Sequence, residues 1–395
     1  MKKKMLVICN QMQLGGVCIA AKNFIDNMHE DYDIEFMLAK PGGELLNRLP
    51  ADVKITNMPY PICCSSMTKN ESKAISKKYF IRKCLTTLMA KSKIVSTPII
   101  GKKLAKKVKQ TGENYYDIVI NNDMDMSPTF VGSCHAYCKH LVKSPTKCLI
   151  VHGDFVANNY DKNFFEKEYL SDYNYVILLS EALKRQMEEI FPQYKDKFIA
   201  IPNFQAVKEI KELSLAEDIK FNKSVLNIVS ASRLTEVKGI MRSLGVLKKL
   251  RGEGYKFCWH ILGEGEQRKE IEEFIKQNGM LDCVKLYGAM KNPYPYMKSA
   301  DLFYLGSYHE AAPMVIGEAN ILGIPVLTTK TISSNCMVDD NYGWVCENTE
   351  NGIYEGFKEI FDNADDLKHK TAMLVNYNFD NESLKKKYNE LLNKV

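Results

Sequence analysis

The chain has 395 residues, 45% of them hydrophobic and 26% charged, which is a composition typical of globular proteins. This length allows two domains. The net charge of +6 is modest, and no run approaches the roughly 20 apolar residues that a membrane-spanning helix requires.

The 12 cysteines form no CxxC pair and no His/Cys cluster with zinc spacing. The N-terminal stretch MKKKMLVICN places lysines before apolar residues, but this apolar run stops at Asn10. It is too short for a secretory signal, and a buried first strand is the better interpretation. We therefore expect a cytoplasmic protein whose thiols are reduced.

The first half alternates short apolar runs with helical patterns. A Gly15-Gly16 turn follows the first run and precedes a helix over about 17–28, and Ser180 is a suitable N-cap for a later helix. Apolar runs with polar ends are typical of buried parallel strands. The runs expected to be strands are 5–10, 34–39, 117–122, 148–153, 175–180 and 198–204.

The segment 69–109 carries thirteen basic residues, and only Glu71 opposes them. Apolar residues lie between the basic ones, and the region 70–110 has a helical pattern. Such a segment suits the anionic surface of a membrane, and we expect peripheral contact with the inner face of the plasma membrane. A solvated helical face is the alternative. No nucleic-acid-binding motif accompanies the charge, so no nucleic-acid partner is expected.

The second half repeats the alternation of strands and helices. The polar stretch 205–224 has few large apolar residues and is expected to be a linker. Helices are expected over 239–254 and 267–279, the second ending at Gly279. The segments expected to hold strands are 226–234, 257–265, 284–288, 301–306 and 325–329.

This alternation predicts an α/β protein with parallel sheets covered by helices on both faces. We expect two Rossmann-like domains that face a cleft: residues 1–205 and residues 206–377. A helix over about 378–395 is expected to pack back onto the first domain. Ligands of such folds bind outside the carboxyl ends of the strands.

The stretch HEAAPMVIGEA carries the most informative spacing in the chain. Glu310 and Glu318 lie eight positions apart around Pro313. Pro313 suits the start of a helix, so Glu310 is expected in a loop and Glu318 inside that helix. The two carboxylates can accept hydrogen bonds from two sets of hydroxyls, and N–H groups at the helix start can bind a phosphate between them.

Two cations follow an expected strand at a second place in this half. Arg233 and Lys238 lie in SRLTEVKG and can hold a diphosphate near a helix start. Alone, such a pair is usually surface charge. His152 ends the run CLIVHG at the carboxyl edge of its sheet, where it can contact a donor sugar, a phosphate or an acceptor. His309 is an alternative polar contact.

A dinucleotide-binding fingerprint is missing from both candidate turns. Gly15-Gly16 and Gly263-Glu264-Gly265 each lack the GxGxxG spacing. An enzyme that transfers hydride is therefore disfavoured, and Gly15-Gly16 remains a turn whose backbone can approach an anion closely.

Together these segments resemble the retaining glycosyltransferases of the GT4 type, which have the GT-B fold. The motifs are Gly15-Gly16, His152, SRLTEVKG, the LGEG turn, the YG pair at 287–288 and EAAPMVIGEANILGIPV. The resemblance covers most of the chain and is strongest over 226–330. The segment IVHGDF also resembles members that build bacterial surface polysaccharides.

The resemblance implies four charged contacts to a nucleotide-sugar donor. Glu310 would bind hydroxyls of the transferred sugar, and Glu318 would bind the ribose. Arg233 and Lys238 would neutralise the diphosphate. The nucleotide sugar would be a co-substrate, with UDP the favoured carrier, and no cofactor is expected.

The resemblance makes residues 1–205 the acceptor side and residues 206–377 the donor side. It also implies contacts through the backbone and from the first domain. Met314 and Val315 would meet the sugar or phosphate, and the backbone near Met290 would meet the base. His152 would lie near the anomeric centre, and Gly15-Gly16 would close over the donor.

Two features depart from the family or compete with it. Members usually carry Gly and Phe after the first glutamate, whereas this chain has Ala311 and Ala312, which bears on donor choice. Asp123-Met124-Asp125 resembles a metal-binding DxD motif, but it lies far from the donor segments and such enzymes generally need no metal. No metal site is expected.

The expected reaction moves a hexose-type sugar to a hydroxyl of a glycan or lipid-linked acceptor, with retention of configuration. Front-face attack is preferred, because the nearest candidate for a carboxylate nucleophile is Glu310, and the resemblance implies that Glu310 binds sugar hydroxyls instead. Two alternatives stay open: a sugar-nucleotide 2-epimerase on the same fold, and a non-catalytic partner subunit.

Overall fold

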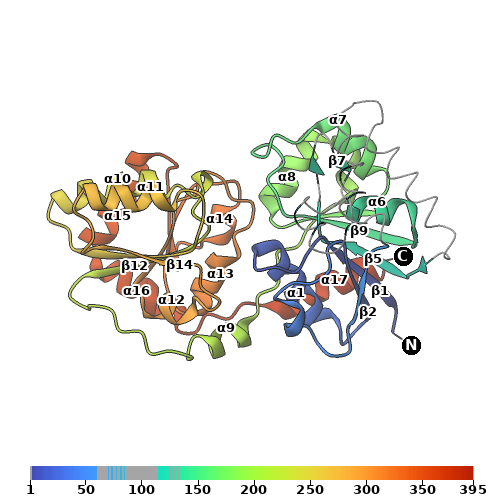
Figure 1. Ribbon diagram of the computed structural model, residues 1–395, viewed down its shortest axis with the longest axis horizontal. Coiled ribbons are helices and arrows are strands. Elements are labelled where there is room, and N and C mark those ends of the chain that lie inside the picture. The colour runs from blue at the N-terminus through green and yellow to red at the C-terminus, as the bar shows by residue number, and fades with distance from the viewer. Residues whose placement is uncertain are drawn as a thin grey trace. The chain divides into compact units, whose positions relative to one another are not determined.

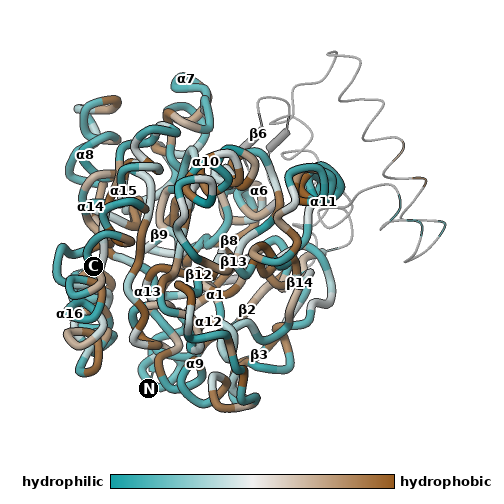
Figure 2. Tube along the Cα trace, turned by 90° about the vertical axis from the view of Figure 1, so that its left-hand side faces the viewer, coloured by the Kyte–Doolittle hydropathy of each residue, from teal (hydrophilic) through white to brown (hydrophobic). Residues whose placement is uncertain are grey.

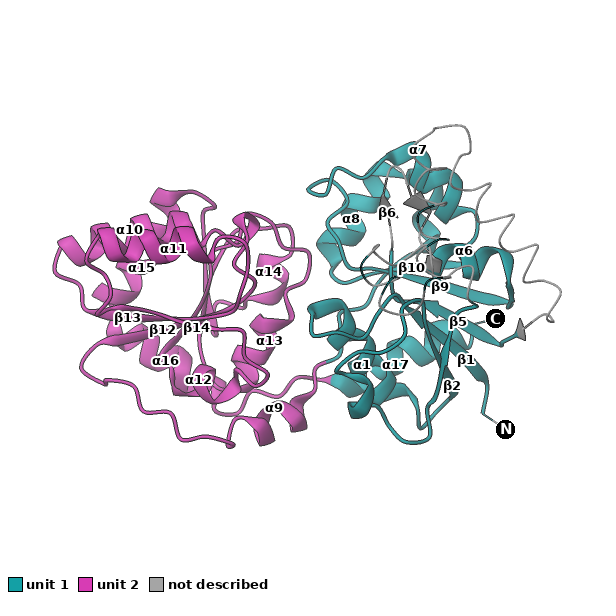
Figure 3. Cartoon of the chain, viewed as in Figure 1, with its two compact units in different colours: residues 1–204, 381–395 teal, residues 205–380 magenta. Residues whose placement is uncertain are grey.

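The computed structural model divides the chain into two compact units, which Figure 3 colours separately. Unit 1 comprises residues 1–204 and 381–395, and unit 2 comprises 205–380. The structure describes residues 2–59, 114–124, 126–127, 130–131 and 133–394, together with Asn70, Lys73, Lys77, Ile81 and Cys84. Apart from those five residues, the basic segment 69–109 is outside the described residues. The membrane contact expected of this segment therefore stays a prediction.

Unit 1 is built on a seven-stranded parallel sheet with the order β11-β10-β9-β5-β1-β2-β3 (Figure 1). The central strands are apolar because helices cover both of their faces, and every residue of β5 is buried. The strands are β1 (Lys4–Cys9), β2 (Asp33–Leu38), β3 (Lys54–Asn57), β5 (Ile118–Asn121), β9 (Thr146–Val151), β10 (Tyr175–Leu178) and β11 (Phe198–Ala200). Two small ribbons pair β4 (Asn114–Tyr115) with β8 (Val142–Lys143) and β6 (Met126–Ser127) with β7 (Phe130–Val131).

The helices of unit 1 follow the strands as the alternation predicts. The Ser180 hydroxyl accepts a hydrogen bond from the Leu183 N–H at 3.1 Å, which confirms it as an N-cap. The described helices are α1 (Gly16–Met28), α6 (Ser133–His140), α7 (Lys162–Phe165), α8 (Glu181–Ile190) and α17 (Asn381–Leu392). Shorter turns are η1 (Leu46–Arg48), η3 (Glu166–Leu170) and η4 (Pro192–Lys197).

Helix α17 joins unit 1 after the chain has passed through all of unit 2. The ring of Tyr388 lies 5.1 Å from the ring of Phe24 on α1 and 5.5 Å from that of Phe204. Asn389 accepts a hydrogen bond from the Tyr32 hydroxyl at 2.8 Å. Phe24, Phe204 and Tyr388 are far apart in the sequence and pack together in the core of unit 1.

Unit 2 is built on a six-stranded parallel sheet with the order β14-β13-β12-β15-β16-β17. The strand order reverses between β12 and β15, where ligands of open α/β sheets bind. The strands are β12 (Leu226–Ala231), β13 (Phe257–Leu262), β14 (Val284–Gly288), β15 (Leu302–Leu305), β16 (Val326–Thr329) and β17 (Gly343–Cys346).

Helices cover both faces of this sheet and enclose two apolar cores. One core joins β12 and β13 to α10, α11 and α15, and the other joins β15 and β16 to α12 and α13. Figure 2 colours the charged helix α11 largely in hydrophilic teal, since only its inner stripe is buried. The helices are α9 (Val207–Leu213), α10 (Ile240–Gly252), α11 (Arg268–Gln277), α12 (Tyr294–Ser299), α13 (Met314–Ile321), α14 (Ser334–Met337), α15 (Glu350–Asp362) and α16 (Ala364–Leu374), with the turn η5 (Glu236–Lys238).

Two local expectations differ from the structure. The stretch 205–224 is not a bare linker, because it holds α9, which buries Ile210 and packs against α12 and α13. A short helix that is largely charged and fully buries only one of its apolar residues is not revealed by composition. Pro313 is the residue before α13 rather than its first residue, with extended backbone at ψ 113.

Candidate functional site

The candidate site of unit 2 lies at the carboxyl end of its sheet. Two segments meet there: the loop and turn that follow β12, and the loop that follows β15. Gly239 lets them approach, since its φ is +66° and an added Cβ would lie 2.1 Å from the Gly306 carbonyl oxygen. Any other residue at 239 would clash with the backbone of the second loop.

Lys238 and Glu310 meet across these two segments. The Lys238 ammonium lies 2.5 Å from Glu310 Oε1, and only 18% and 11% of the two side chains are exposed. The Ser307 hydroxyl donates to the same oxygen at 2.6 Å. Glu310 thus has one oxygen fully engaged, and its other oxygen has no hydrogen-bond partner among the described residues.

The loop that carries Glu310 is fixed by its own backbone. The Tyr308 N–H donates to the Val237 carbonyl at 2.8 Å, and the Thr329 hydroxyl donates to the Ser307 carbonyl at 2.5 Å. These bonds link the loop to both η5 and β16. The loop that carries Glu310 is therefore fixed by two neighbouring segments.

Arg242 and Asn348 add a buried clamp to the same loop. Arg242 Nη2 donates to the Gly306 carbonyl at 2.8 Å and to Asn348 Oδ1 at 2.6 Å. Asn348 Nδ2 in turn donates to the Tyr308 carbonyl at 2.9 Å. The guanidinium also lies 3.7 Å from the centre of the Tyr308 ring, a cation–π geometry.

Replacing Arg242 with methionine is expected to lower the free energy of unfolding of unit 2 by about 2–4 kcal/mol. The variant keeps an apolar stem but leaves two acceptors without their donor, at about 1–3 kcal/mol each. The two tryptophans of the chain, Trp259 and Trp344, both lie in unit 2, so tryptophan fluorescence in urea reports its unfolding.

Arg251→Met provides the matched control for this measurement. Arg251 also donates to a carbonyl, that of Gly279 at 2.6 Å, and to Asp282 at 3.1 Å, but it is 36% exposed. Its loss should cost no more than about 1 kcal/mol. Equal losses in the two variants would contradict the clamp.

Glu318 occupies a different environment from Glu310. It lies in α13 with 6% of its surface exposed. Burial raises its pKa to about 7, and a hydrogen bond with Tyr294 lowers it in part. The carboxyl group therefore changes its charge near neutral pH, where hydroxyl donors from a ligand would favour the ionised form.

The other expected donor contacts of unit 2 lie at the same end of the sheet. Arg233 follows β12, is exposed, and has no ion-pair partner among the described residues. Met290 follows β14 and is half-buried. Met314 and Val315 are the first two residues of α13, and the Met314 carbonyl accepts a hydrogen bond from Gln205 at 3.2 Å.

Unit 1 presents its expected site residues at the carboxyl end of its own sheet. His152 directly follows β9, and its Nε2 lies 3.2 Å from Asn122 Oδ1 after β5. Burial lowers the pKa of His152 to about 4, so the ring is neutral at pH 7. Gly15 and Gly16 are exposed at the start of α1, with open space beside both.

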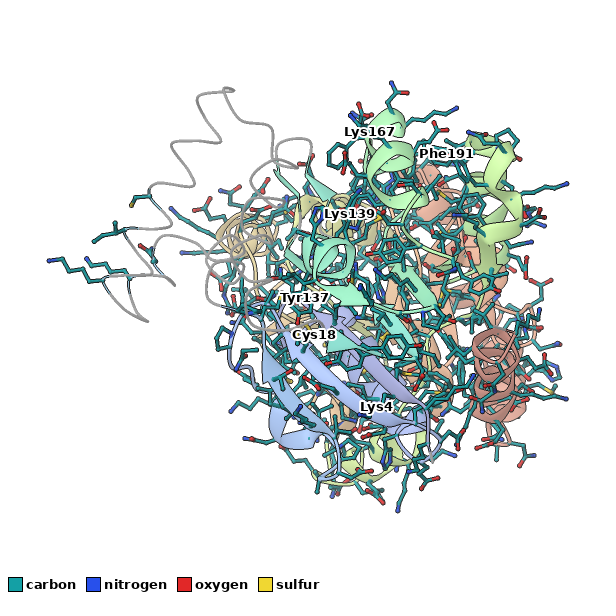
Figure 4. All side chains as sticks on the ribbon, turned by 90° about the vertical axis from the view of Figure 1, so that its right-hand side faces the viewer. Lys4, Cys18, Tyr137, Lys139, Lys167 and Phe191 are labelled. Carbon is teal, nitrogen blue, oxygen red and sulfur yellow. The ribbon has the colours of Figure 1, made fainter. Side chains whose placement is uncertain are left out.

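Asn121, His135 and Tyr173 form a buried hydrogen-bonded group in unit 1. The Asn121 amide donates to the Tyr173 hydroxyl at 2.7 Å, and His135 Nδ1 lies 3.1 Å from the same hydroxyl. Burial lowers the pKa of His135 to about 3. Figure 4 labels Tyr137 and Lys139 on α6, and Lys139 pairs with Asp172 at 2.6 Å.

Metal ligands are not grouped in the part of the chain that the structure describes, where no three His, Cys, Asp or Glu side chains converge. Asp123 Oδ2 accepts a hydrogen bond from the Asn10 N–H at 3.1 Å, while Asp125 lies outside that part. Among the described residues, no helix combines the length and apolar character needed to cross a bilayer.

Sequence reasoning missed the residues that support Glu310 and Glu318. Ser307, Arg242, Asn348 and Tyr294 all contact or position these carboxylates. Arg242 lies four residues after Lys238, one turn further along the chain, which is the one signal that could have marked it. Asn348 is 106 positions from Arg242, and nothing local reveals their contact.

A family profile matches most of unit 2. The profile of the family described as "Glycosyl transferases group 1" matches residues 212–377. This range includes Arg233, Lys238, Glu310 and Glu318.

Curated relatives are similar over part of their length. An uncharacterized glycosyltransferase, MJ1059 of Methanocaldococcus jannaschii, is 24% identical over 58% of this chain and 59% of its own. The amylovoran biosynthesis glycosyltransferase AmsD of Erwinia amylovora is 24% identical over 55% of this chain and 62% of its own. The chain thus matches about three fifths of the length of these relatives.

Solved structures match over the whole length. Anabaena HepE in complex with UDP and glucose has a TM-score of 0.68 at 14% identity and covers 100% of both chains. Sucrose-phosphate synthase of Thermosynechococcus elongatus has a TM-score of 0.70 at 12% identity, covering 99% of this chain and 98% of its own. The expected α/β fold with two parallel sheets is thereby confirmed as the GT-B fold, and residues 212–377 match the profile of the glycosyl transferases group 1 family.

Proposed function

We propose that this protein is a retaining glycosyltransferase of bacterial surface polysaccharide synthesis. It would move a hexose-type sugar from a nucleotide sugar to a hydroxyl of a glycan or lipid-linked acceptor. The observation that carries this proposal is the Lys238–Glu310 pair, at 2.5 Å, beside the start of α13. It presents a cation for phosphate and a carboxylate for sugar hydroxyls at one point.

The donor contacts follow from the charges around this pair. Lys238 and Arg233 neutralise the diphosphate, and the first N–H groups of α13 add partial positive charge. The outer oxygen of Glu310 accepts from the transferred sugar, and Glu318 accepts from the ribose. UDP is the proposed carrier, because Anabaena HepE, which is similar in fold, has been solved in complex with UDP and with UDP and glucose.

The chemical step needs no protein nucleophile in this proposal. The acceptor oxygen attacks the anomeric carbon on the face from which the diphosphate leaves. The anomeric C–O bond breaks, and the acceptor proton passes to the departing phosphate oxygen. Lys238 and Arg233 stabilise the negative charge that grows there. His152, neutral at pH 7, is proposed to contact the sugar near the anomeric carbon.

Two measurements test this function. We expect turnover with one donor among UDP-, GDP- and ADP-sugars. Its nucleoside diphosphate should be released at a rate that depends on added acceptor, such as a lipid-linked glycosyl diphosphate. The product should show the anomeric coupling constant of the donor by NMR. Interconversion of the sugar without acceptor would instead indicate an epimerase, and no turnover with any donor would indicate a non-catalytic subunit.

The place of action is proposed from the acceptor. A lipid-linked acceptor would bring the protein to the cytoplasmic face of the membrane as a peripheral partner. Sedimentation with vesicles that contain anionic lipid, compared with neutral vesicles, tests this contact.

A further inference from the structure

A groove of about 740 Å³ lies in unit 2 beside β17, and neither Lys238 nor Glu310 lines it. Its floor is the run of five consecutive residues 343–347, and its walls come from α15 and α16. Successive residues of a strand point to opposite faces of the sheet, so one face presents only alternate residues. A groove that contacts every residue of β17 therefore lies along the edge of the strand.

β17 is the last strand of its sheet, with β16 on one side only. The Val326 N–H donates to the Tyr342 carbonyl, and the Lys330 N–H donates to the Cys346 carbonyl, at 3.2 and 2.8 Å. In a parallel ladder, alternate residues face the partner strand. Val345 therefore directs its N–H and carbonyl outward, and neither has a hydrogen-bond partner among the described residues.

The walls of the groove approach the strand closely and remain fixed. An added Cβ at Gly356 of α15 would lie 3.0 Å from the Cys346 side chain. Lys370 of α16 lies over the Trp344 ring at 4.9 Å and donates to the Asp340 carbonyl. These contacts hold both helices against the strand, while Val345 stays half-exposed.

The groove carries a charge opposite to that of the chain. Five carboxylates line it against the single ammonium of Lys370, although the chain as a whole has a net charge of +6. The carboxylates are those of Asp340, Glu347, Glu355, Glu359 and Asp366. Asp340, Glu355 and Glu359 have no ion-pair partner among the described residues.

We propose that this groove binds an extended, lysine- or arginine-rich segment of a partner protein, which adds as a further strand beside β17. The outward N–H and carbonyl of Val345 supply main-chain hydrogen bonds, and the acidic walls select basic side chains. A second copy of this chain does not fit, because pairing two β17 edges would bring two sets of five carboxylates together.

The spacing of the carboxylates fits an extended peptide. Glu355 and Glu359 are one helical turn apart, about 6 Å along α15. Alternate side chains of a strand are separated by about 6.6 Å. Basic residues at every second position of the peptide would therefore face successive carboxylates of the wall.

The test uses fluorescein-labelled acetyl-(Val-Lys)₃-amide and fluorescence anisotropy with the full chain. We expect saturable binding, and no binding of the (Val-Glu)₃ peptide. Glu355→Gln with Glu359→Gln should weaken binding about fivefold or more. The control pair, Glu217→Gln with Asp218→Asn, changes two exposed carboxylates outside the groove and should leave binding unchanged.

Strand addition is tested separately from charge. Val345→Pro removes an outward N–H that takes no part in the β16 ladder, a position where an edge strand tolerates proline. This variant should abolish binding while its tryptophan fluorescence stays native, and N-methylation of the peptide backbone should do the same. Binding that survives both changes would overturn strand addition. Self-association that Val345→Pro abolishes, or no peptide binding at all, would overturn the proposed partner.

Discussion

Replacing Glu310 with glutamine is expected to reduce sugar transfer by about two to three orders of magnitude while unit 2 stays folded. The amide keeps the shape and can still accept from Lys238 and Ser307, which lie 2.5 and 2.6 Å from Oε1. It lacks the charge that strengthens hydrogen bonds to sugar hydroxyls in the transition state, and one such loss costs about 3–4 kcal/mol. Acceptor-dependent release of nucleoside diphosphate measures the effect.

The control for Glu310→Gln is Asp282→Asn. Asp282 also pairs with a cation, Arg251 at 3.1 Å, but it lies before β14, at the opposite end of the sheet from the site. Its loss should leave transfer unchanged. If Glu310→Gln retains full activity with native tryptophan fluorescence, Glu310 has no role in transfer.

Replacing Glu318 with glutamine is expected to stabilise unit 2 at alkaline pH. Burial raises the native pKa of Glu318 to about 7 from the ordinary 4.5. Between these values the native state binds more protons than the unfolded state, so the wild-type free energy of unfolding falls as pH rises. The loss amounts to about 2–3 kcal/mol between pH 5 and pH 8. The variant should lack this loss.

Urea titrations of tryptophan fluorescence at pH 5, 7 and 8 measure this difference between Glu318→Gln and wild type. Glu355→Gln, an exposed change in the same unit, should keep the wild-type slope with pH. The same Glu318 variant should bind UDP more weakly if the carboxylate accepts from ribose. A parallel pH dependence of wild type and Glu318→Gln would show that Glu318 is not the titrating group.

The sequence predicts the buried parts of this fold well. Runs such as 5–9 and 118–120 are apolar throughout because helices cover both faces of their strands, and few other structures require that pattern. The same pattern does not reveal the strands at the edges of the two sheets. β3, with the sequence KITN, has no buried residue, and β17 is a four-residue strand at a sheet edge.

The site is predicted only as a set of residue types. The spacing of Glu310 and Glu318 and the pair Arg233 and Lys238 are visible in the sequence. Their geometry is not, because Lys238 and Glu310 are 72 positions apart and meet only where β12 and β15 lie side by side. The burial that separates Glu318 from Glu310 likewise depends on tertiary packing.

The return of α17 to unit 1 sets an order for biosynthesis. A ribosome completes every residue of unit 2 before it makes Tyr388, which lies between Phe24 and Phe204 in the other unit. Unit 1 therefore cannot complete its core until its last helix has been synthesised. Until then, the apolar side chains that Tyr388 covers lack this contact. A premature stop codon near position 380 would leave the residues of unit 2 complete and remove part of the core of unit 1.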